Sequence, residues 1–369
     1  MHPDTHALHA GHTPNTTPGP FMPGPQFSAT YITPGDPSEH ALLYGRFNNP
    51  TWTAWEKALA DLEGGAALAF SSGMAAVTAL FATVLRPGDT VVLPADCYYT
   101  TRQLIAGWFA EHGIKHRLVP TTTVPAKGAF DGARLVLAET PSNPELAIAD
   151  IAAWAAEARA AGALLAVDNT TATVALQQPL ALGATFSVAS DTKMLTGHAD
   201  LVLGHVATSS TEWFEKLLLW RKLGGAIPGP MEVWLAHRAL GTVGVRLARQ
   251  CDSAMAVATM LSGRRDVHNV LYPGLAAHPG HDAAARQMRR PGCVLSFDVG
   301  SKERATAFLG ALTLVREATS FGGIHSTAER RARWGGDAVT DGFVRFSCGI
   351  EATEDLLADI QQALATAGA

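Results

Sequence analysis

Short apolar segments alternate with helical repeats over most of the chain after Pro50, and this alternation constrains the fold more than any other feature. Trp52, Trp55, Leu59 and Leu62 recur at spacings of three and four, which predicts an amphipathic helix. Short strands separated by helices predict a mostly parallel sheet that is buried on both faces. We expect strands at 67–70, 90–93, 116–119, 134–138, 164–168 and 185–189, with helices from about 73, at 104–112 and at 148–161.

The pattern changes at about Pro228, where a long helical stretch begins. Strands at 293–299 and 342–346 and helices at 302–312 and from 353 then indicate a smaller α+β domain. A chain of 369 residues is long enough for two domains. We therefore expect an N-terminal arm at 1–48, a large α/β domain at 49–245 and an α+β domain at 246–369.

The arm is rich in proline, glycine, threonine and histidine and has no sustained apolar period. Such a segment cannot form a core of its own. It is either a disordered tail or an arm that wraps a partner subunit, and Tyr44 to Pro50 ends it with groups suited to binding an anion.

Composition narrows the classes of function. A hydrophobic content of 47%, a charged content of 17% and a net charge of −5 are typical of a globular protein and give no basic surface for nucleic acid. No apolar run approaches the roughly 20 residues that span a bilayer, and the chain begins without a signal segment. Cys97, Cys251, Cys293 and Cys348 form no CxxC pair, so we assign no metal site and expect a cytoplasmic protein with a small-molecule partner.

Lys193 follows two hydroxyl residues, Ser190 and Thr192, which can bind an anion beside its amine. This suggests a Schiff-base lysine in a pyridoxal phosphate site, although a solvated surface loop is the alternative. Asp168 ends an apolar strand, at the sheet edge where ligands bind in open α/β folds. A buried aspartate needs a cationic partner, and a protonated pyridine nitrogen is one. The two residues together predict pyridoxal phosphate chemistry, with a helix N-cap as the alternative role for Asp168.

Other polar residues also follow predicted strands. Gly73, with Met74 next to it, begins a helix after a strand, which suits a phosphate but also suits close packing. The ring of Tyr98 could stack on a pyridine and its hydroxyl could move protons, or it could simply pack at a helix start. Asn143 lies in a proline-bounded turn that has a structural role or presents its amide to a ligand.

Ser320 and Arg345 supply a hydroxyl and a guanidinium in the smaller domain. Arginine suits bidentate binding of a carboxylate, which an amino-acid substrate carries. The alternative for Arg345 is a surface salt bridge, which the apolar neighbours Val344 and Phe346 disfavour.

Together these segments resemble the Cys/Met metabolism family of pyridoxal phosphate enzymes over nearly the whole chain. That family includes cystathionine γ-lyase, γ-synthase and β-lyase, methionine γ-lyase and the homoserine sulfhydrylases. The resemblance rests on His9-Ala10-Gly11, Tyr44-Gly45-Arg46, Asn49-Pro50-Thr51, Ser72 to Ala76, Thr140 to Pro144, Val167 to Thr170, Ser190 to Lys193 with Gly197-His198, and Arg345-Phe346-Ser347.

The resemblance implies an aspartate-aminotransferase-like α/β fold (fold type I), with a large, mostly parallel, seven-stranded sheet domain and a smaller α+β C-terminal domain. It also implies a homo-oligomer, which we expect to be a dimer of dimers. In this scheme Lys193 forms the Schiff base, Asp168 holds the pyridine nitrogen and Tyr98 stacks on the ring. Gly73, Met74, Ser190 and Thr192 would bind the phosphate, Tyr44 and Arg46 would reach the phosphate of the neighbouring subunit, and Asn143, Ser320 and Arg345 would orient the substrate carboxylate.

The resemblance further implies α,γ-elimination on L-cystathionine or a related thioether amino acid, to a 2-oxo acid, ammonia and a thiol. Lys193 would remove the α-proton and Tyr98 would protonate the leaving group. Methionine γ-lyase activity, or γ-replacement on an activated homoserine, is the nearest alternative. A noncatalytic cofactor-binding scaffold is a more distant one, and nucleic-acid binding by the arginine-rich stretch is weaker still.

Three departures from the family bear on the substrate. Leu43 and Thr319 stand where cystathionine enzymes often carry acids, which favours a less polar γ-substituent. Arg102 favours the opposite, because a guanidinium there could bind a distal carboxylate. The stretch 329–333 contains Arg330, Arg331 and Arg333, which could bind an anionic substrate end or form a solvated basic loop.

Overall fold

The computed structural model describes residues 1–12 and 18–368. Residues 13–17, which belong to the proline-rich arm, and residue 369 lie outside the described residues.

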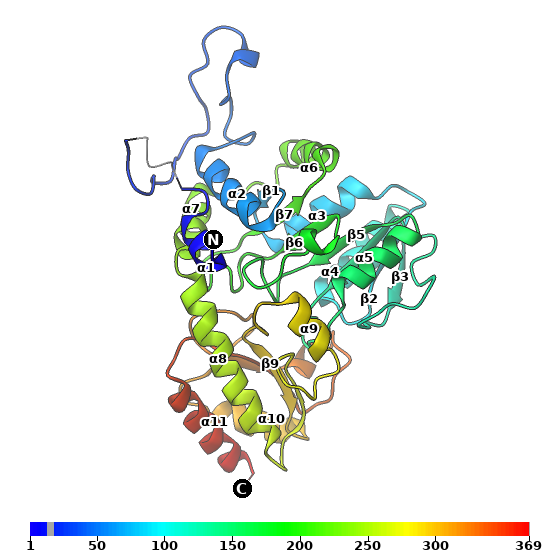
Figure 1. Ribbon diagram of the computed structural model, residues 1–369, viewed down its shortest axis with the longest axis vertical. Coiled ribbons are helices and arrows are strands. Elements are labelled where there is room, and N and C mark those ends of the chain that lie inside the picture. Colours follow the sequence, from blue (N-terminus) through cyan, green and yellow to red (C-terminus); the bar gives the residue numbers. More distant parts are fainter. Residues whose placement is uncertain (13–17, 369) are drawn as a thin grey trace.

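The predicted large sheet is present, and most of its pairs are parallel (Figure 1). Neighbouring strands are parallel from β6 to β3, whereas β7 is antiparallel to both β1 and β6. The seven strands lie in the order β1 (Ala66–Phe70), β7 (Gly204–Thr208), β6 (Phe186–Ala189), β5 (Leu164–Asp168), β4 (Leu135–Glu139), β2 (Thr90–Pro94) and β3 (Lys115–Val119).

Helices cover both faces of this sheet, which explains why its strands are apolar along their whole length. Phe70, Leu93 and Val188 pack against one layer, and Ala69, Val136 and Val167 pack on the opposite face. The first layer contains α3 (Gly73–Val84), α4 (Tyr99–Leu104) with a π-helical continuation at Ile105–Phe109, and α6 (Thr211–Gly224). The second contains α2 (Pro50–Glu63), α5 (Ile151–Ala160) and α7 (Pro230–Leu240).

The second, smaller sheet forms the C-terminal α+β unit below the first in Figure 1. Its strands, in spatial order, are β10 (Arg316–Glu317), β11 (Thr327–Arg330), β12 (Phe343–Ser347), β9 (Val294–Asp298) and β8 (His268–Leu271). The associated helices are α8 (Val243–Ser262), α9 (His281–Gln287), α10 (Lys302–Ala311) and α11 (Thr353–Ala367). Because α8 runs without interruption through the expected boundary at 245/246, it connects the two units, and the domain limits stay a prediction.

The described part of the arm contains one regular helix, α1 (Pro3–His9), and a short 3-10 turn at Pro37–Glu39. Beyond residue 18 it extends away from the body as a long loop (Figure 1). It is tied down near its base, where Gln26 N donates to Thr51 Oγ1 (2.9 Å) and Trp234 Nε1 donates to the Pro23 carbonyl (2.9 Å). Its contact with a neighbouring subunit stays a prediction.

Several elements were not predicted, namely α1, β7, α6, β8, β10 and β11. The interval 190–227 illustrates the reason, because β7 contains Gly204 and His205 and does not read as an apolar strand. In α6 the apolar residues are spread around the helix, so that Leu219 and Leu223 are exposed while Leu217 is buried. The residues described include no helix of the length and apolarity needed to cross a membrane.

Candidate active site

The carboxyl ends of β4, β5 and β6 face a cavity of about 290 Å³ between the two units. This is where an open α/β sheet places ligands. The cavity brings together most of the residues that the sequence singled out: Gly73, Met74, Tyr98, Asn143, Asp168, Ser190, Thr192, Lys193, Thr319, Ser320 and Arg345.

Lys193 lies in the loop that follows β6, and its Nζ donates a hydrogen bond to Ser320 Oγ at 2.6 Å. Nζ is also 5.2 Å from the centroid of the Phe321 ring. Burial, reinforced by the nearby Arg345 charge and opposed by Glu329, lowers the pKa of Lys193 to about 8. The solvated-loop alternative is therefore wrong, and the amine can exist in its neutral, proton-accepting form close to neutral pH.

Ser320 holds this position with a φ of 74°, in the left-handed region that residues other than glycine rarely adopt. Such a conformation persists only where the surroundings fix it, and it is common at functional sites. The next residues supply the restraint, because Gly322 N donates to Ser347 Oγ at 2.8 Å.

Asp168 ends β5 with its side chain buried. Thr170 N donates to its Oδ1 at 3.0 Å. Burial raises the pKa of Asp168, while hydrogen bonds from Thr170 and the positive charge of His205 oppose the increase. A carboxyl group with a raised pKa at the cavity wall gains from a cationic ligand, which is the role expected for Asp168.

The turn from β1 into α3 also lines the cavity. Ser72 caps the helix by accepting a hydrogen bond from Ala75 N (3.0 Å), and the first amides of a helix have no partner inside it. A Cβ atom on Gly73 would lie 2.6 Å from Ser190 Cβ, so glycine is needed for the close approach of the two predicted phosphate-binding segments. The Thr192 hydroxyl is engaged with Leu203, donating to its carbonyl (3.1 Å) and accepting from its N–H (3.0 Å).

Tyr98 stands at the mouth of the cavity with 42% of its surface exposed. Its backbone N–H donates to Glu139 Oε2 (2.6 Å), and the N–H of Asn143 donates to Glu139 Oε1 (2.9 Å). Glu139 thus holds two predicted site residues in place, and burial together with the Asp168 charge raises its pKa well above the usual range. Glu139 was not among the predicted site residues, although it ends β4 just as Asp168 ends the neighbouring β5.

Arg345 is buried in β12, so the alternative of a surface salt bridge is wrong. Its guanidinium donates to Asn143 Oδ1 (2.6 Å) and to the Ser320 carbonyl (2.7 Å), and it forms an ion pair with Glu329. Burial lowers the pKa of Arg345 to about 10 against the opposing effect of Glu329. The three predicted carboxylate-binding residues therefore form one connected group.

The stretch 329–333 is partly buried, and each of its charged side chains has an ion-pair partner. Glu329 is fully buried and pairs with Arg331 (2.7 Å) and Arg333 (3.0 Å) as well as with Arg345. Arg331, also buried, makes a further ion pair with Asp337 at 2.6 Å. The interpretation as a solvated basic loop is wrong for Arg331, whose charge two internal carboxylates neutralise, whereas Arg330 and Arg333 also pair with the more exposed Asp341 and Glu317. Glu329 was not predicted to have a role, because the sequence prediction for this stretch considered only its arginines.

Three predicted residues lie outside the cavity of Lys193. Arg102 donates to the carbonyls of Cys97 (2.9 Å) and Gly336 (2.7 Å). Tyr44 and Arg46 line a separate cavity of about 650 Å³ that also includes Pro228 and Gly229. The roles assigned to these three residues stay predictions.

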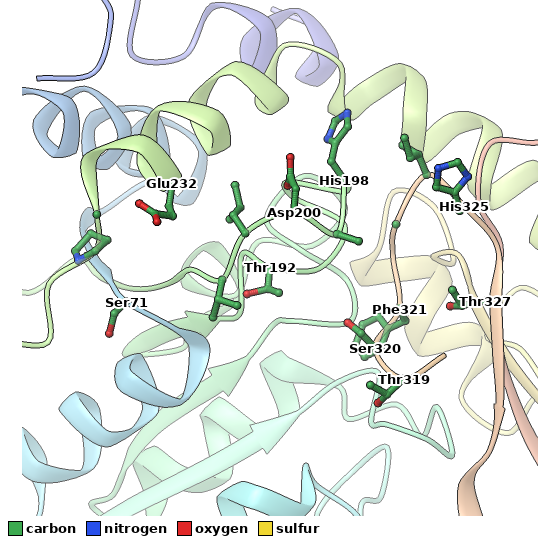
Figure 2. A pocket seen from close by; sticks show the side chains of 17 residues that line it. Ser71, Thr192, His198, Asp200, Glu232, Thr319, Ser320, Phe321, His325 and Thr327 are labelled. Carbon is green, nitrogen blue, oxygen red and sulfur yellow. The ribbon is translucent and has the colours of Figure 1, made fainter. Parts of the chain in front are cut away.

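A larger, open cavity of about 800 Å³ adjoins the first and shares Thr192, Val202 and residues 319–321 with it. Figure 2 shows Thr319, Ser320 and Phe321 on one side of it, with Asp200 and Glu232 across from them. Pro228 and Gly229 also line it, so it adjoins the cavity of Tyr44 and Arg46. The open space thus extends from Lys193 toward the base of the arm.

The sheet order, the buried lysine and the strand-end aspartate define a fold type I pyridoxal phosphate enzyme. Residues 4–365 match the model of the Cys/Met metabolism PLP-dependent enzymes, and the chain belongs to this family. It is 48% identical to a putative cystathionine γ-lyase of Streptomyces coelicolor, over 98% of this chain and 93% of that protein. It is 41% identical to a cystathionine γ-synthase of Mycobacterium bovis, over 98% of this chain and 96% of that protein. The structure of a methionine γ-lyase from Micromonospora echinospora superposes with a TM-score of 0.91 at 35% identity, covering 99% of both chains.

Pyridoxal phosphate is the family's cofactor, and the residues present fit it. Lys193 offers a buried amine with a lowered pKa. Asp168 offers a buried carboxyl group with a raised pKa, and a positively charged ring nitrogen beside it would lower that pKa again. The glycine turn at Gly73 leaves room beside Ser190 for close approach of the backbone to a phosphate. When bound, this cofactor acts as an electron sink that stabilises a carbanion at the substrate α-carbon.

Proposed function

We propose that the protein is a carbon-sulfur lyase that catalyses α,γ-elimination on L-cystathionine or a closely related thioether amino acid. The products are a 2-oxo acid, ammonia and a thiol. The observation that carries the proposal is the group of Lys193, Ser320 and Arg345, in which a proton-accepting amine lies beside a buried carboxylate-binding guanidinium.

Each residue has a defined task in this reaction. Arg345, fixed by Asn143 and the Ser320 carbonyl, binds the substrate carboxylate and thereby sets the position of the α-carbon. Lys193 accepts the α-proton, and Ser320 Oγ keeps Nζ oriented toward the cavity. Tyr98, whose ring is partly exposed at the mouth, donates a proton to the sulfur of the leaving thiol.

Similarity to a putative cystathionine γ-lyase supports elimination over the alternatives. The absence of acids at Leu43 and Thr319 keeps a methionine γ-lyase activity as a related outcome, since a thioether without a distal ammonium needs no acidic partner. Arg102 gives less support to a distal carboxylate than the sequence suggested, because its guanidinium already binds two backbone carbonyls.

A second candidate is γ-replacement on an activated homoserine, favoured by the similarity to a cystathionine γ-synthase. It uses the same α-proton transfer to Lys193. The two reactions differ at the γ-carbon, where replacement adds an incoming thiol and elimination adds none. The two differ experimentally in their need for a thiol acceptor.

The test is a substrate panel with the purified holoenzyme. Release of 2-oxo acid is measured from cystathionine, methionine and homocysteine, each with and without O-acetylhomoserine or O-succinylhomoserine plus a thiol. We expect release from a thioether amino acid alone. A new thioether that forms only when an activated homoserine and a thiol are both present, with no 2-oxo acid released from the thioether amino acids alone, would overturn the lyase proposal and favour γ-replacement.

A further inference from the structure

A histidine lies between two carboxylates inside the large domain, next to the loop that carries Lys193. His205 Nδ1 is 2.6 Å from Asp191 Oδ1, and His205 Nε2 is 3.0 Å from Glu63 Oε1. All three side chains have an exposed fraction of 0%. The reaction proposed above uses none of them, so this buried cluster needs a separate explanation.

The geometry favours a protonated imidazole. A neutral imidazole donates from only one nitrogen, whereas both nitrogens of His205 face acceptor oxygens. Burial alone lowers the pKa of His205, but the charges and hydrogen bonds of Asp191 and Glu63 overcome this and raise the pKa to about 10. Ser187 Oγ also donates to Glu63 Oε1, at 2.9 Å. The cluster is therefore an imidazolium with two charge-assisted hydrogen bonds.

The cluster joins three parts of the fold that surround the cofactor loop. Glu63 is the last residue of α2, His205 lies in β7, and Asp191 is two residues before Lys193. Thr196 closes the loop by donating from its N (3.2 Å) and Oγ1 (2.8 Å) to the Asp191 carbonyl. His205 thus anchors the start of this loop to the sheet through the Asp191 side chain.

Other charges act on the same loop. From α8, the Arg246 guanidinium donates to the carbonyls of Met194 (2.9 Å) and Leu195 (3.0 Å). From β5, Asp168 is the carboxyl group expected to face the cofactor ring nitrogen, and the positive charge of His205 lowers its pKa against the effect of burial. His205 therefore acts on two cofactor-binding groups, mechanically on one and electrostatically on the other.

We infer that His205 is a positioning residue for the cofactor: it holds the Lys193 loop through Asp191, and it places a positive charge in β7, two strands from Asp168 at the end of β5. This inference rests on the family's cofactor and not on the substrate proposed above. Its tests use the holoenzyme without substrate, so failure of the elimination proposal leaves them unaffected.

The first test is a pH titration of the visible absorbance of the holoenzyme, comparing wild type with His205→Gln. Glutamine can hydrogen bond but cannot carry the positive charge. Losing that charge favours the protonated form of the lysine-bound chromophore, so we expect the absorbance midpoint to move to higher pH by roughly half a unit or more. The matched control is Ser187→Ala, which removes a neutral hydrogen bond from the same cluster and is expected to leave the midpoint unchanged.

A folded His205→Gln protein with the wild-type midpoint would overturn the electrostatic role, as would an equal shift in Ser187→Ala. If His205→Gln does not fold, Asp191→Asn decides the matter, because it leaves the Glu63 bond to His205 in place while weakening the anchor of the loop. We then expect several-fold faster loss of the cofactor absorbance on dilution into cofactor-free buffer. A rate equal to that of wild type would contradict the positioning role.

Discussion

At the scale of single residues, the chemistry depends on how Lys193 and Arg345 share one environment. Burial lowers the pKa of both groups. The positive charge of Arg345 lowers the pKa of Lys193 further, that of Arg331 does the same to Arg345, and Glu329 opposes the decrease at both. As pH rises, Lys193 loses its proton before Arg345 does, because the pKa of Lys193 is about 8 and that of Arg345 is about 10. The same cavity thus holds one group that can accept a proton near neutral pH and one that stays cationic, as its predicted role in binding a carboxylate requires.

Replacing Arg345 by lysine should separate binding from chemistry. Lysine keeps the charge but loses the planar set of donors that reaches Asn143, the Ser320 carbonyl and Glu329. We expect the KM for cystathionine to increase roughly 10- to 100-fold, in proportion to the loss of a charged hydrogen bond, with a smaller change in kcat. Steady-state kinetics checks this.

Arg102→Lys is the matched control for that variant, because Arg102 lies outside the cavity of Lys193 and binds the carbonyls of Cys97 and Gly336. We expect only a small change in KM. If both variants raise the KM equally, Arg102 contacts the substrate and the assignment made from the sequence for that residue is correct.

Of the residues that line the cavity, the sequence singled out those that end predicted strands or stand beside a characteristic motif, such as Asp168, Lys193 and Arg345. It missed residues whose importance comes from their partners. Glu329 lies in a stretch dominated by arginines, and its role depends on β11 pairing with β12, which places it opposite Arg345. No local pattern carries that information, because the pairing joins residues that are distant along the chain.

At the scale of elements, the fold follows from alternating apolar segments wherever both faces of a strand are buried by helices. The elements from β1 to β6 were predicted on this basis, with shifts of only a few residues. The prediction failed at β7, where His205 interrupts the apolar run. That polar residue is tolerated in the core because Asp191 and Glu63 pair with it, and the sequence does not reveal such a partnership.

The same cluster should make stability depend on alkaline pH. Because the folded pKa of His205 is raised to about 10 from an ordinary value of 6.5, its stabilisation is fully present below about 6.5 and is lost as pH rises through about 10. We expect the free energy of unfolding of wild type to fall by a few kcal/mol over this range. Urea unfolding at a series of pH values measures it.

His205→Gln should show a flatter dependence in that experiment, because glutamine does not titrate, and Ser187→Ala should keep the wild-type slope. An equally steep loss of stability in His205→Gln would mean that other groups control the alkaline transition.

At the scale of the whole molecule, the arrangement of the cavities supports an active site shared between subunits. Tyr44 and Arg46, at the base of the extended arm, lie outside the cavity of Lys193 in the same chain. The large open cavity adjoins both regions, so a second chain could bring its arm toward the cofactor site (Figures 1 and 2). The homo-oligomer and the assignment of these residues to a neighbouring phosphate stay predictions.

Complementation between inactive subunits tests this arrangement. Lys193→Ala and Arg46→Ala chains, each expected to be inactive alone, are co-expressed and purified together. If Arg46 serves the neighbouring subunit, hybrid dimers contain one intact site and random pairing restores about a quarter of the wild-type activity. If activity does not return in verified hybrids, Arg46 acts within its own chain or outside the site.

The most direct test of the central claim is the identity of the products that purified holoenzyme forms from L-cystathionine alone. Mass spectrometry of the reaction resolves the thiol and the 2-oxo acid. α,γ-Elimination predicts cysteine, 2-oxobutanoate and ammonia in equal amounts, with no activated homoserine added. Homocysteine with pyruvate, or no product under these conditions, would contradict the proposed reaction.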